Sequence, residues 1–424
     1  MEMSQSSNFN KWLVLIAGFL GWMGAGVQIS LFPLIGRTML TDLFSSVSDP
    51  IVREKQVAMW FSWFVTSFLF GAALGGWVFG ILGDRLGRKT SLGFSVLCYS
   101  LGTLGSYFFS QPETLICLRF LSCMGVGGTW PNAVALVTEA WQGASKTWIS
   151  GWLGAAANFG FVLLGMIAYF VPVTVDAWRW IILVSSTPVF LSGFIFLLVP
   201  ESTSWKAKQQ NAGFHTESIW KQPWLSRTIL GIALGAVPTV GTAVSAAWLI
   251  PWADSVAQAK GKELKGDPRV KAWTQITRSS GAVVGSLFGG WLASMVGRRL
   301  SYFAISLLAL LASEYIFLFL TPDHPWFSAW VFIVGVVGVT YFGWLPLYLP
   351  ELFPTALRAT GIGVAFNFGR IVAGFFALGS TLLVSWFGGD YARIGAVTSL
   401  VFGLGLFIIL FAPDTSKTST EKAA

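Results

Sequence analysis

Apolar residues along this chain gather in long runs that are separated by charged residues, proline or glycine. Twelve runs fall at about 12–34, 56–82, 90–110, 113–137, 147–171, 177–199, 226–252, 270–296, 300–321, 325–349, 359–386 and 390–412. Each run is at least as long as the roughly 20 residues that an α-helix needs to cross a bilayer. The runs are too long and continuous for the strands of a membrane barrel. The pattern predicts an all-α polytopic membrane protein with twelve transmembrane helices.

Composition narrows the class of protein. Of the 424 residues, 54% are hydrophobic and 11% are charged, whereas soluble proteins carry about 25% charge. Twelve spans take up about 240 residues, and the connectors left over are too short for a catalytic or nucleotide-binding domain of about 100 residues. A soluble enzyme, a disordered regulator and an ATP-driven pump contained in one chain are therefore excluded. No cofactor and no metal site are expected.

The formal charge of +8 does not indicate nucleic-acid binding. The 27 Lys and Arg residues are spread along the connectors and form no basic face, so we expect them to set topology and to contact anionic lipid. An even number of spans places both termini on one side. The basic loops and the motif described below favour the cytoplasm for that side. We expect a multi-pass protein of the plasma membrane, or of the inner membrane in a bacterium, that functions as a monomer.

The chain contains an internal repeat, and its longest polar connector, residues 200–225, lies at the midpoint. Asn158-Phe159-Gly160 returns as Asn367-Phe368-Gly369, and Glu139 returns as Glu351. Five further positions repeat at an offset of 210 residues: Gly71, Gly75, Gly80, Gly87 and Arg88 become Gly281, Gly285, Gly290, Gly297 and Arg298. We predict two six-helix bundles related as parallel repeats, with a substrate site between them. The predicted divisions are 1–204, a linker at 205–225, 226–412 and a tail at 413–424.

The segment Gly83-Asp84-Arg85-Leu86-Gly87-Arg88-Lys89, between the second and third runs, resembles the cytoplasmic loop motif of the major facilitator superfamily. A degenerate copy stands at residues 294–299. Three further segments resemble the sugar-porter and metabolite:proton symporter branches: Arg119 with Gly125, Pro200-Glu201-Ser202, and Pro350-Glu351-Leu352-Phe353-Pro354 with Arg358. The resemblance covers nearly the whole chain. It implies a transporter that works by alternating access.

The loop motif also has a physical rationale of its own. Its glycines permit a tight turn, and Asp84 with the basic residues can bond to helix ends or to Glu139, which would latch one conformation. A loop that served only as a topology signal would explain Arg88 and Lys89 but not Asp84. In the second copy Ser294 and Met295 replace the acid and the base, which puts a second latch in doubt. The candidate gating residues are Gly83, Asp84, Arg85, Gly87, Arg88, Lys89, Glu139, Gly297, Arg298, Arg299, Glu351 and Arg358.

Four charged residues lie well inside apolar runs: Arg119, Arg278, Glu314 and Arg370. An unpaired charge in the membrane costs several kcal/mol, so each is a functional candidate. Arg278 and Glu314 both lie about 10–12 Å from the outer end of their spans, a depth at which they could form an ion pair and serve in coupling. Arg119 could likewise meet Gln28 of the first span.

The first span departs from the pattern of the relatives. The resemblance implies aspartates where this chain has Ala25 and Gln28, and neither residue can titrate. Conventional proton coupling through the first span is therefore not expected. Uniport, exchange, or coupling of protons through Glu314 remain open. Gln28 could hydrogen-bond a substrate or Arg119, and a purely structural role between helices is equally compatible with the sequence.

Three embedded arginines against one glutamate favour a positively charged cavity and an organic anion such as a carboxylate. The sugar-porter likeness favours a sugar instead, carried by a facilitator or by a proton symporter that uses Glu314. A transporter-like sensor is a third alternative. A membrane-embedded enzyme is disfavoured, because both histidines lie in connectors and no aspartate lies inside a run. The substrate-binding candidates are Gln28, Arg119, Trp130, Asn132, Trp248, Tyr341, Trp344 and Arg370; Trp130 and Trp344 could stack on a substrate ring.

Overall fold

The structure is a computed structural model that describes residues 2–141, 145–171, 173–211, 218–260, 268–413 and 415. The first half of the chain forms α1 (Glu2–Leu43), α2 (Pro50–Leu86), α3 (Arg88–Gly105), α4 (Pro112–Ala140), α5 (Ser145–Phe170), α6 (Trp180–Ser186) and α7 (Val189–Leu198). A short helix, α8 (Thr203–Asn211), lies in the connector. The second half forms α9 (Trp224–Val240), α10 (Leu249–Lys260), α11 (Pro268–Met295), α12 (Arg298–Phe319), α13 (Phe327–Leu352), α14 (Arg358–Asn367), α15 (Gly369–Leu378), α16 (Ser380–Trp386), α17 (Tyr391–Ser399) and α18 (Val401–Ile408).

Within the described residues, ten helical segments are long and apolar enough to cross a membrane. The helices α3 and α11 lie at the positions of the third and eighth predicted spans and complete the twelve. The all-α membrane fold predicted from the sequence is therefore confirmed. Spans six, seven, eleven and twelve each consist of more than one helical piece.

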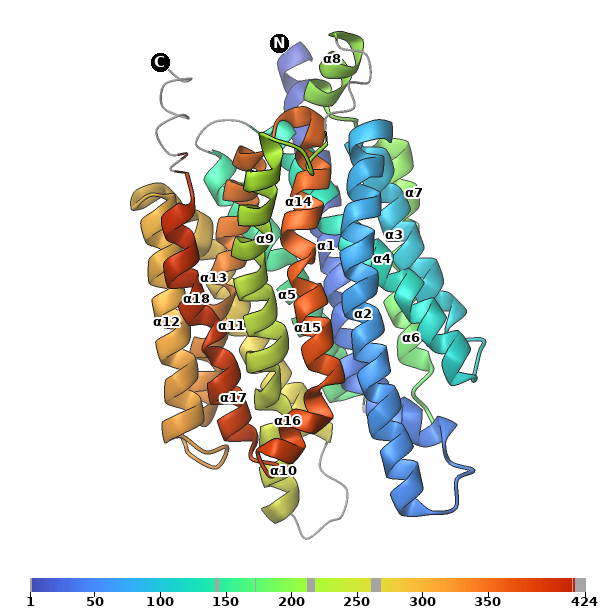
Figure 1. The fold of residues 1–424 in the computed structure, drawn as a ribbon. Coiled ribbons are helices and arrows are strands. Elements are labelled where there is room, and N and C mark those ends of the chain that lie inside the picture. Colours follow the sequence, from blue (N-terminus) through green and yellow to red (C-terminus); the bar gives the residue numbers. More distant parts are fainter. Residues whose placement is uncertain are drawn as a thin grey trace.

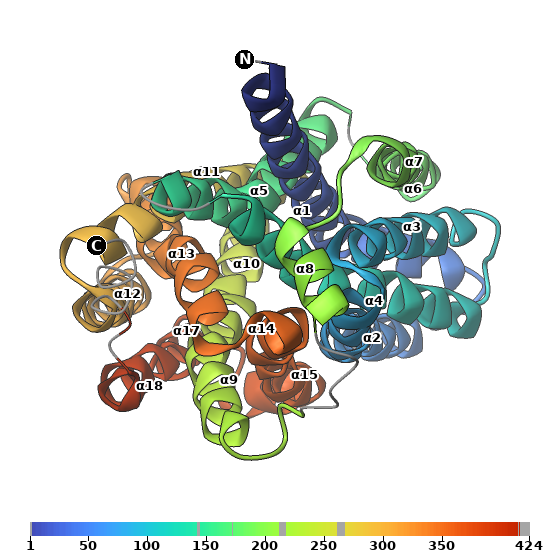
Figure 2. The same cartoon turned by 90° about the horizontal axis from the view of Figure 1, so that it is seen from above.

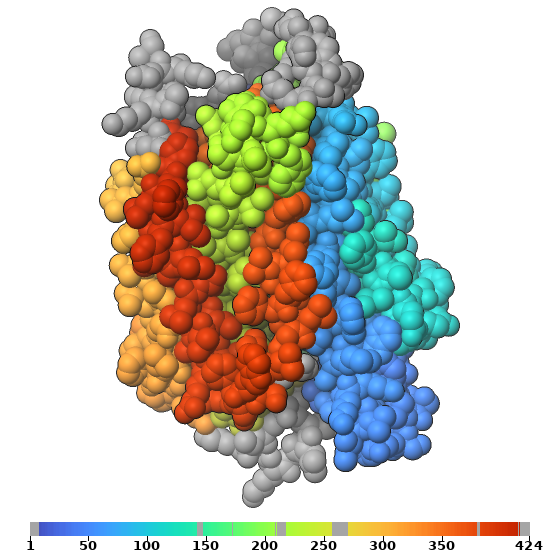
Figure 3. Space-filling view, viewed as in Figure 1, coloured from blue at the N-terminus to red at the C-terminus, as the bar shows by residue number. Residues whose placement is uncertain are grey.

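The two halves stand side by side, with α1–α7 on one side and α9–α18 on the other (Figures 1 and 3). The start of α1 and the end of α18 lie at the same end of the molecule, which we call the terminal end. Across the seam between the halves, α2 packs against α14 and α15, and α5 packs against α11 and α13 (Figure 2). The seam is therefore lined by α2, α5, α11, α13, α14 and α15.

The first two spans are longer than predicted, since α1 continues to Leu43 and α2 begins at Pro50. Pro33 lies inside α1 without ending it. Arg37 of α1 forms an ion pair with Glu54 of α2 at 2.7 Å, and Asp42 accepts a bond from the Trp178 indole at 2.9 Å. These polar contacts extend both helices past the end of their apolar runs.

Glycines at repeat-related positions let helices approach closely in both halves. A Cβ added to Gly75 of α2 would lie 1.9 Å from the carbonyl oxygen of Met124 in α4, and one added to Gly285 of α11 would lie 1.9 Å from that of Val336 in α13. Such separations are far below van der Waals contact, so only glycine fits. The repeated glycines thus hold the same helix pair together in each half.

The seventh span is irregular at its centre. A π-helical turn at Gly241–Ser245 and a 3₁₀ turn at Ala246–Trp248 interrupt it between α9 and α10. Pro238, just before the π turn, lacks an N–H donor, which favours such a break. In span eleven, a turn at Phe368 separates α14 from α15. These irregular segments belong to the second half.

Candidate functional site

At the terminal end, charged residues of the motif form a buried network. Arg88 is fully buried and contacts two acids of its own half: Asp84 at 3.1 Å and Glu139 at 3.3 Å. Arg358, from the second half, contacts the same Glu139 oxygen at 3.1 Å. Arg88 also donates to the carbonyl oxygen of Thr355 at 2.5 Å. The network therefore joins the two halves of the chain.

Asp84 caps a helix of the opposite half. Its carboxylate accepts bonds from the backbone N–H of Ala359 at 3.2 Å, the N–H of Thr360 at 2.9 Å and the Thr360 hydroxyl at 2.5 Å. Ala359 and Thr360 lie at the start of α14, where unpaired N–H groups and the helix dipole favour a negative charge. We call the contacts of Asp84, Arg88, Glu139, Arg358 and Thr360 the terminal latch.

The connector after α7 supports the terminal latch. The Glu201 carboxylate accepts a bond from the Lys89 N–H at 3.0 Å, and the Ser202 hydroxyl donates to Glu139. The Trp205 indole donates to the Asp84 carbonyl oxygen at 2.8 Å. These three residues were not predicted as site residues, although the Pro200-Glu201-Ser202 motif marked the place. Of the predicted gating residues, Arg85 points to the exterior.

The second repeat builds only part of this arrangement. Arg298 contacts Glu351 at 3.0 Å and donates to the Ala293 carbonyl oxygen at 3.0 Å, as Arg88 does to Gly83 at 2.7 Å. Ser294, at the position of Asp84, is exposed and donates to Trp291 of its own helix. The arginine–glutamate pair is repeated, whereas the cap across the seam is made by the first half.

The turns that lead into α3 and α12 require glycine. Gly87 has a φ of 110° and Gly297 a φ of 89°, values that side-chain-bearing residues rarely adopt. Arg299 follows the second turn and donates to the Ala412 carbonyl oxygen at 2.5 Å. Both motif glycines therefore set the direction of the next helix.

Nearer the centre of the spans, two arginines from opposite halves converge on one aromatic ring. The guanidinium carbons of Arg119 (α4) and Arg370 (α15) lie 5.6 Å and 5.1 Å from the ring centroid of Phe68 in α2. Their exposed fractions are 8% and 6%. The buried Nε atoms of both residues, and Nη1 of Arg370, have no hydrogen-bond partner among the described residues. No ion pair within the described residues neutralises either charge.

Aromatic rings surround this pair. Trp130 of α4 stacks on Phe366 of α14 across the seam, and Trp22 of α1 packs against both rings. Arg370 also lies 5.5 Å from the centroid of Phe366. We call Arg119, Arg370, Phe68, Phe366 and Trp130 the seam cluster. It joins three of the predicted substrate-binding residues to two rings that sequence reasoning missed.

Phe366 stands four residues before Arg370, which is one helical turn. That spacing was the available signal for Phe366. Phe68 lies in a run rich in phenylalanine, and nothing in the sequence indicates that it, and not a neighbouring phenylalanine, would contact the arginines.

Gln28 is fully engaged within the first half. Its amide donates to the Ser185 carbonyl oxygen at 2.6 Å and accepts from the Thr103 hydroxyl at 2.6 Å. Arg119 reaches only the backbone oxygen of Gln28, at 3.0 Å. Asn132 likewise bonds inside its half, to the carbonyl oxygens of Phe79 and Gly128. The contacts of Gln28 favour its structural interpretation, whereas the buried amide oxygen of Asn132 has no partner among the described residues.

Three predicted substrate-binding residues lie away from the seam cluster. Trp344 is fully buried between Tyr302 and Tyr348, and its indole donates to the Arg298 carbonyl oxygen at 3.0 Å. Tyr341 bonds to Ser306 at 2.8 Å. Trp248 packs against Tyr391. All three side chains contact residues of the second half, and their assignment to the substrate site stays a prediction.

The expected ion pair between Arg278 and Glu314 is not formed. Glu314 is half-buried on the side of α12 that faces α17, and it accepts a bond from the Ser399 hydroxyl at 2.5 Å. Arg278 lies on α11, which packs mainly against α13 and α5. The two residues share a depth in the membrane but point in different directions.

Comparison with known sequences places the chain among membrane transporters. The sequence profile of the Major Facilitator Superfamily matches residues 14–258, and the profile described as sugar (and other) transporter matches 252–424. A candidate niacin/nicotinamide transporter of Bacillus subtilis (strain 168) is 27% identical over 431 residues, covering 94% of this chain and 100% of the relative. A cis,cis-muconate transport protein of Acinetobacter baylyi is 24% identical over 353 residues, covering 78% and 82%.

Solved structures share the fold. A proton:xylose symporter superposes with a TM-score of 0.75 at 15% identity, covering 96% of this chain and 97% of the other. A human organic anion transporter superposes with a TM-score of 0.71 at 14% identity, covering 94% and 99%. At such identities the likeness concerns the fold alone.

Proposed function

Because the chain belongs to the major facilitator superfamily, whose members named above transport small solutes, we propose that this transporter carries an organic anion with a carboxylate group. The observation that carries the proposal is Arg370, which is 6% exposed on the seam and has N–H groups without a partner in the part of the chain that the structure describes. A carboxylate would supply the missing acceptors and neutralise the charge. Arg119 lies over the Phe68 ring, as Arg370 does, and adds to the positive potential at this point.

The rings of the seam cluster suit the carbon body of such a substrate. Phe366 and Trp130 are buried and stacked on each other beside Arg370. Separation of the halves would expose their apolar faces, and apolar walls with few polar groups are the usual form of a small-molecule site. Two relatives are named for niacin/nicotinamide and for cis,cis-muconate. These names support an organic acid as the class of substrate and leave the individual compound to experiment.

We propose uniport or exchange as the mode of transport. Gln28 cannot titrate and both its amide atoms are already bonded. Glu314 faces α17, away from both arginines of the seam cluster. Without an embedded acid beside the arginines, a bound anion would be the group that neutralises them while the site is occluded. This favours a loaded carrier that reorients faster than an empty one.

The terminal latch is proposed as the gate of alternating access. It joins the halves through Asp84 and α14, and breaking these contacts would let the halves part at that end. The terminal end is proposed to face the cytoplasm. In this arrangement the substrate path toward the cytoplasm is closed.

A liposome assay tests the proposal. Purified protein is reconstituted, and uptake of labelled carboxylates and sugars is measured with and without a pH gradient. We expect carboxylate uptake, stimulated by unlabelled carboxylate inside the vesicles. Arg370→Gln should lower it at least tenfold, whereas Arg278→Gln, another embedded arginine, should change it less than twofold. Unchanged carboxylate uptake in Arg370→Gln would overturn the proposal.

A sugar is the second candidate, favoured by the match of residues 252–424 to the sugar (and other) transporter profile. Uptake of a sugar but of no carboxylate in the same assay would establish it. Binding of a solute without any flux would instead favour a sensor.

A further inference from the structure

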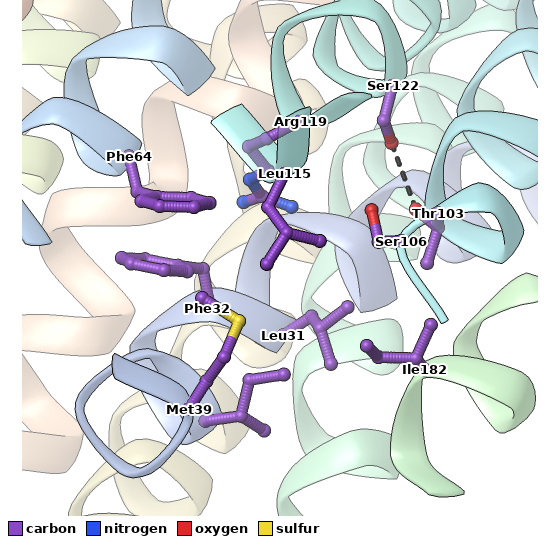
Figure 4. A pocket seen from close by; sticks show the side chains of 11 residues that line it. Leu31, Phe32, Met39, Phe64, Thr103, Ser106, Leu115, Arg119, Ser122 and Ile182 are labelled. Carbon is purple, nitrogen blue, oxygen red and sulfur yellow. Dashed lines mark hydrogen bonds between the residues drawn. The ribbon is translucent and has the colours of Figure 1, made fainter. Parts of the chain in front are cut away.

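A second polar feature lies inside the first half, apart from the seam. It is a partly open cavity of about 40 Å³ lined by residues of α1, α2, α4 and α6 and of the C-terminal end of α3 (Figure 4). Phe32 and Phe64 line one side, and the hydroxyl groups of Thr103, Ser106 and Ser122 line another. Room for a water-sized species begins at about 10–15 Å³. The cavity therefore accommodates a very small ligand and excludes an organic acid with a carbon skeleton.

Arg119 is the charged group of this cavity. Its guanidinium lies between the phenylalanine rings and the hydroxyl groups (Figure 4). The residue is 8% exposed and one N–H donates to the Gln28 carbonyl oxygen at 3.0 Å. Its buried Nε has no partner among the residues that the structure describes. No acid within the described part of the chain forms an ion pair with it. A buried cation in that state is costly unless an anion joins it.

The hydroxyl groups complete the polar wall. Thr103 donates to the Gln28 side chain at 2.6 Å and contacts Ser122 at 3.0 Å. Ser106 donates to the Gly102 carbonyl oxygen of its own helix at 3.1 Å. Ser122 donates to the Tyr99 carbonyl oxygen at 3.0 Å. A serine hydroxyl that rotates away from such a backbone acceptor can turn its hydrogen toward an anion. The cavity thus offers a fixed positive charge, an adjustable donor and apolar walls.

We propose that this cavity binds a single halide ion, chloride under ordinary conditions, held by Arg119. The resemblance implies an aspartate at the position of Gln28, and Gln28 supplies only amide and carbonyl groups. The halide would supply the negative charge that such an aspartate carries. The cavity is lined by the first half alone, so the halide is a second anion beside the carboxylate proposed at Arg370, and Arg119 belongs to both the cavity and the seam cluster. Occupancy stabilises the packing of α4 against α1 and α3.

Thermal unfolding in detergent tests the proposal without any substrate. The full-length protein is transferred to sodium gluconate and titrated with sodium chloride or bromide at constant ionic strength. Binding to the folded state should raise Tm in a saturable manner, by about 2–4 °C. Arg119→Gln should abolish the halide-dependent rise, while Arg278→Gln should retain it. Equal Tm values in chloride and gluconate would overturn the proposal and indicate a cavity that holds water.

A second measurement keeps the test decisive if Arg119→Gln does not fold. Broadening of the chlorine-35 resonance by the wild-type protein, reversed by bromide, should be lost in Gln28→Glu, because a carboxylate beside Thr103 repels a halide. Gln28→Leu, which adds no charge, should keep the broadening. Retention of the signal in Gln28→Glu would contradict the assignment. Neither readout depends on transport, so the halide site and the carboxylate substrate can fail independently.

Discussion

Trp130 of α4 and Phe366 of α14 stack nearly face to face across the seam, with ring centroids 3.9 Å apart and ring planes at 17°. Along α4, Trp130 stands between Arg119 and Glu139. Along span eleven, Phe366 stands between Arg358 and Arg370. The stack therefore lies between the two arginines and the terminal latch, and the halves are joined on the terminal side by rings and by charges.

Substitution by phenylalanine should affect Trp130 and Trp344 differently, because Trp130 stacks on a ring and Trp344 donates a hydrogen bond. Trp130→Phe keeps a ring against Phe366 and loses no hydrogen bond, since its indole N–H has no partner. Trp344→Phe loses the bond to the Arg298 carbonyl oxygen, a loss of about 1–3 kcal/mol. We expect Tm to fall by several degrees for Trp344→Phe and by less than half as much for Trp130→Phe. Equal decreases would show that the Trp130 indole does more than stack.

The terminal latch should depend on Asp84 and not on its counterpart Ser294. Asp84→Asn removes the charge that caps α14, and charge-assisted bonds contribute about 1.5–3 kcal/mol. We expect uptake to fall about tenfold, with the halves parting at the terminal end. Spin labels at the exposed positions Arg85 and Met295, in a variant without native cysteines, would report longer distances.

Ser294→Asn is the matched control, because Ser294 bonds within its own helix and is exposed. It should leave the label distances and uptake unchanged. If Ser294→Asn lengthens the distances as much as Asp84→Asn does, the asymmetry between the two repeats has no role in gating.

Much of the fold could be predicted because bilayer thickness fixes the length of a span, and the apolar runs show that length directly. The contact of Arg88 with Glu139 followed from motif residues that recur in both halves. Rotation about the helix axis could not be predicted. The helix α13 is apolar on all sides. A helix without a polar face gives no indication of which side faces its own half, so the orientation of Trp344 and Tyr341 could not be predicted.

The same limit explains Arg278 and Glu314. Position along a helix gives depth in the membrane, at 1.5 Å per residue, but says nothing of the neighbour that a side chain faces. Gln28 shows a related difficulty. Its amide bonds to the hydroxyl of Thr103 and to the backbone oxygen of Ser185. Every residue carries a backbone oxygen, so the amino-acid sequence does not show which one will accept such a bond.

Glu314 should not couple transport to protons. Its carboxylate accepts a hydrogen bond from Ser399 on the α17 side of α12. A proton bound there would therefore not contact the seam cluster directly. Glu314→Gln keeps an acceptor for the same hydroxyl and should leave uptake and its pH dependence within twofold of wild type between pH 5.5 and 8. Loss of accumulation driven by a pH gradient in this variant would restore Glu314 as the proton carrier.

Alanine substitutions at two adjacent glycines of α2 should have different effects. One should affect the stability of the first half, and the other should affect the contact between the halves. A Cβ on Gly75 would lie 1.9 Å from the Met124 carbonyl oxygen within the first half. A Cβ on Gly76 would lie 2.3 Å from the Asn367 amide nitrogen and 2.7 Å from the Gly363 carbonyl oxygen, both across the seam. One substitution strains the bundle in every conformation, and the other strains only the closed seam.

We therefore expect Gly75→Ala to lower Tm by several degrees without changing the distance between labels at Arg85 and Met295. Gly76→Ala should do the reverse, with a small change in Tm and longer label distances, because the halves can relieve its clash by moving apart. Uptake should fall for both variants, so uptake alone does not distinguish them. Were Gly76→Ala to lower Tm as much as Gly75→Ala, the seam would be part of the folded core in all conformations, and alternating access by separation of the halves along α2 and α14 would have to be abandoned.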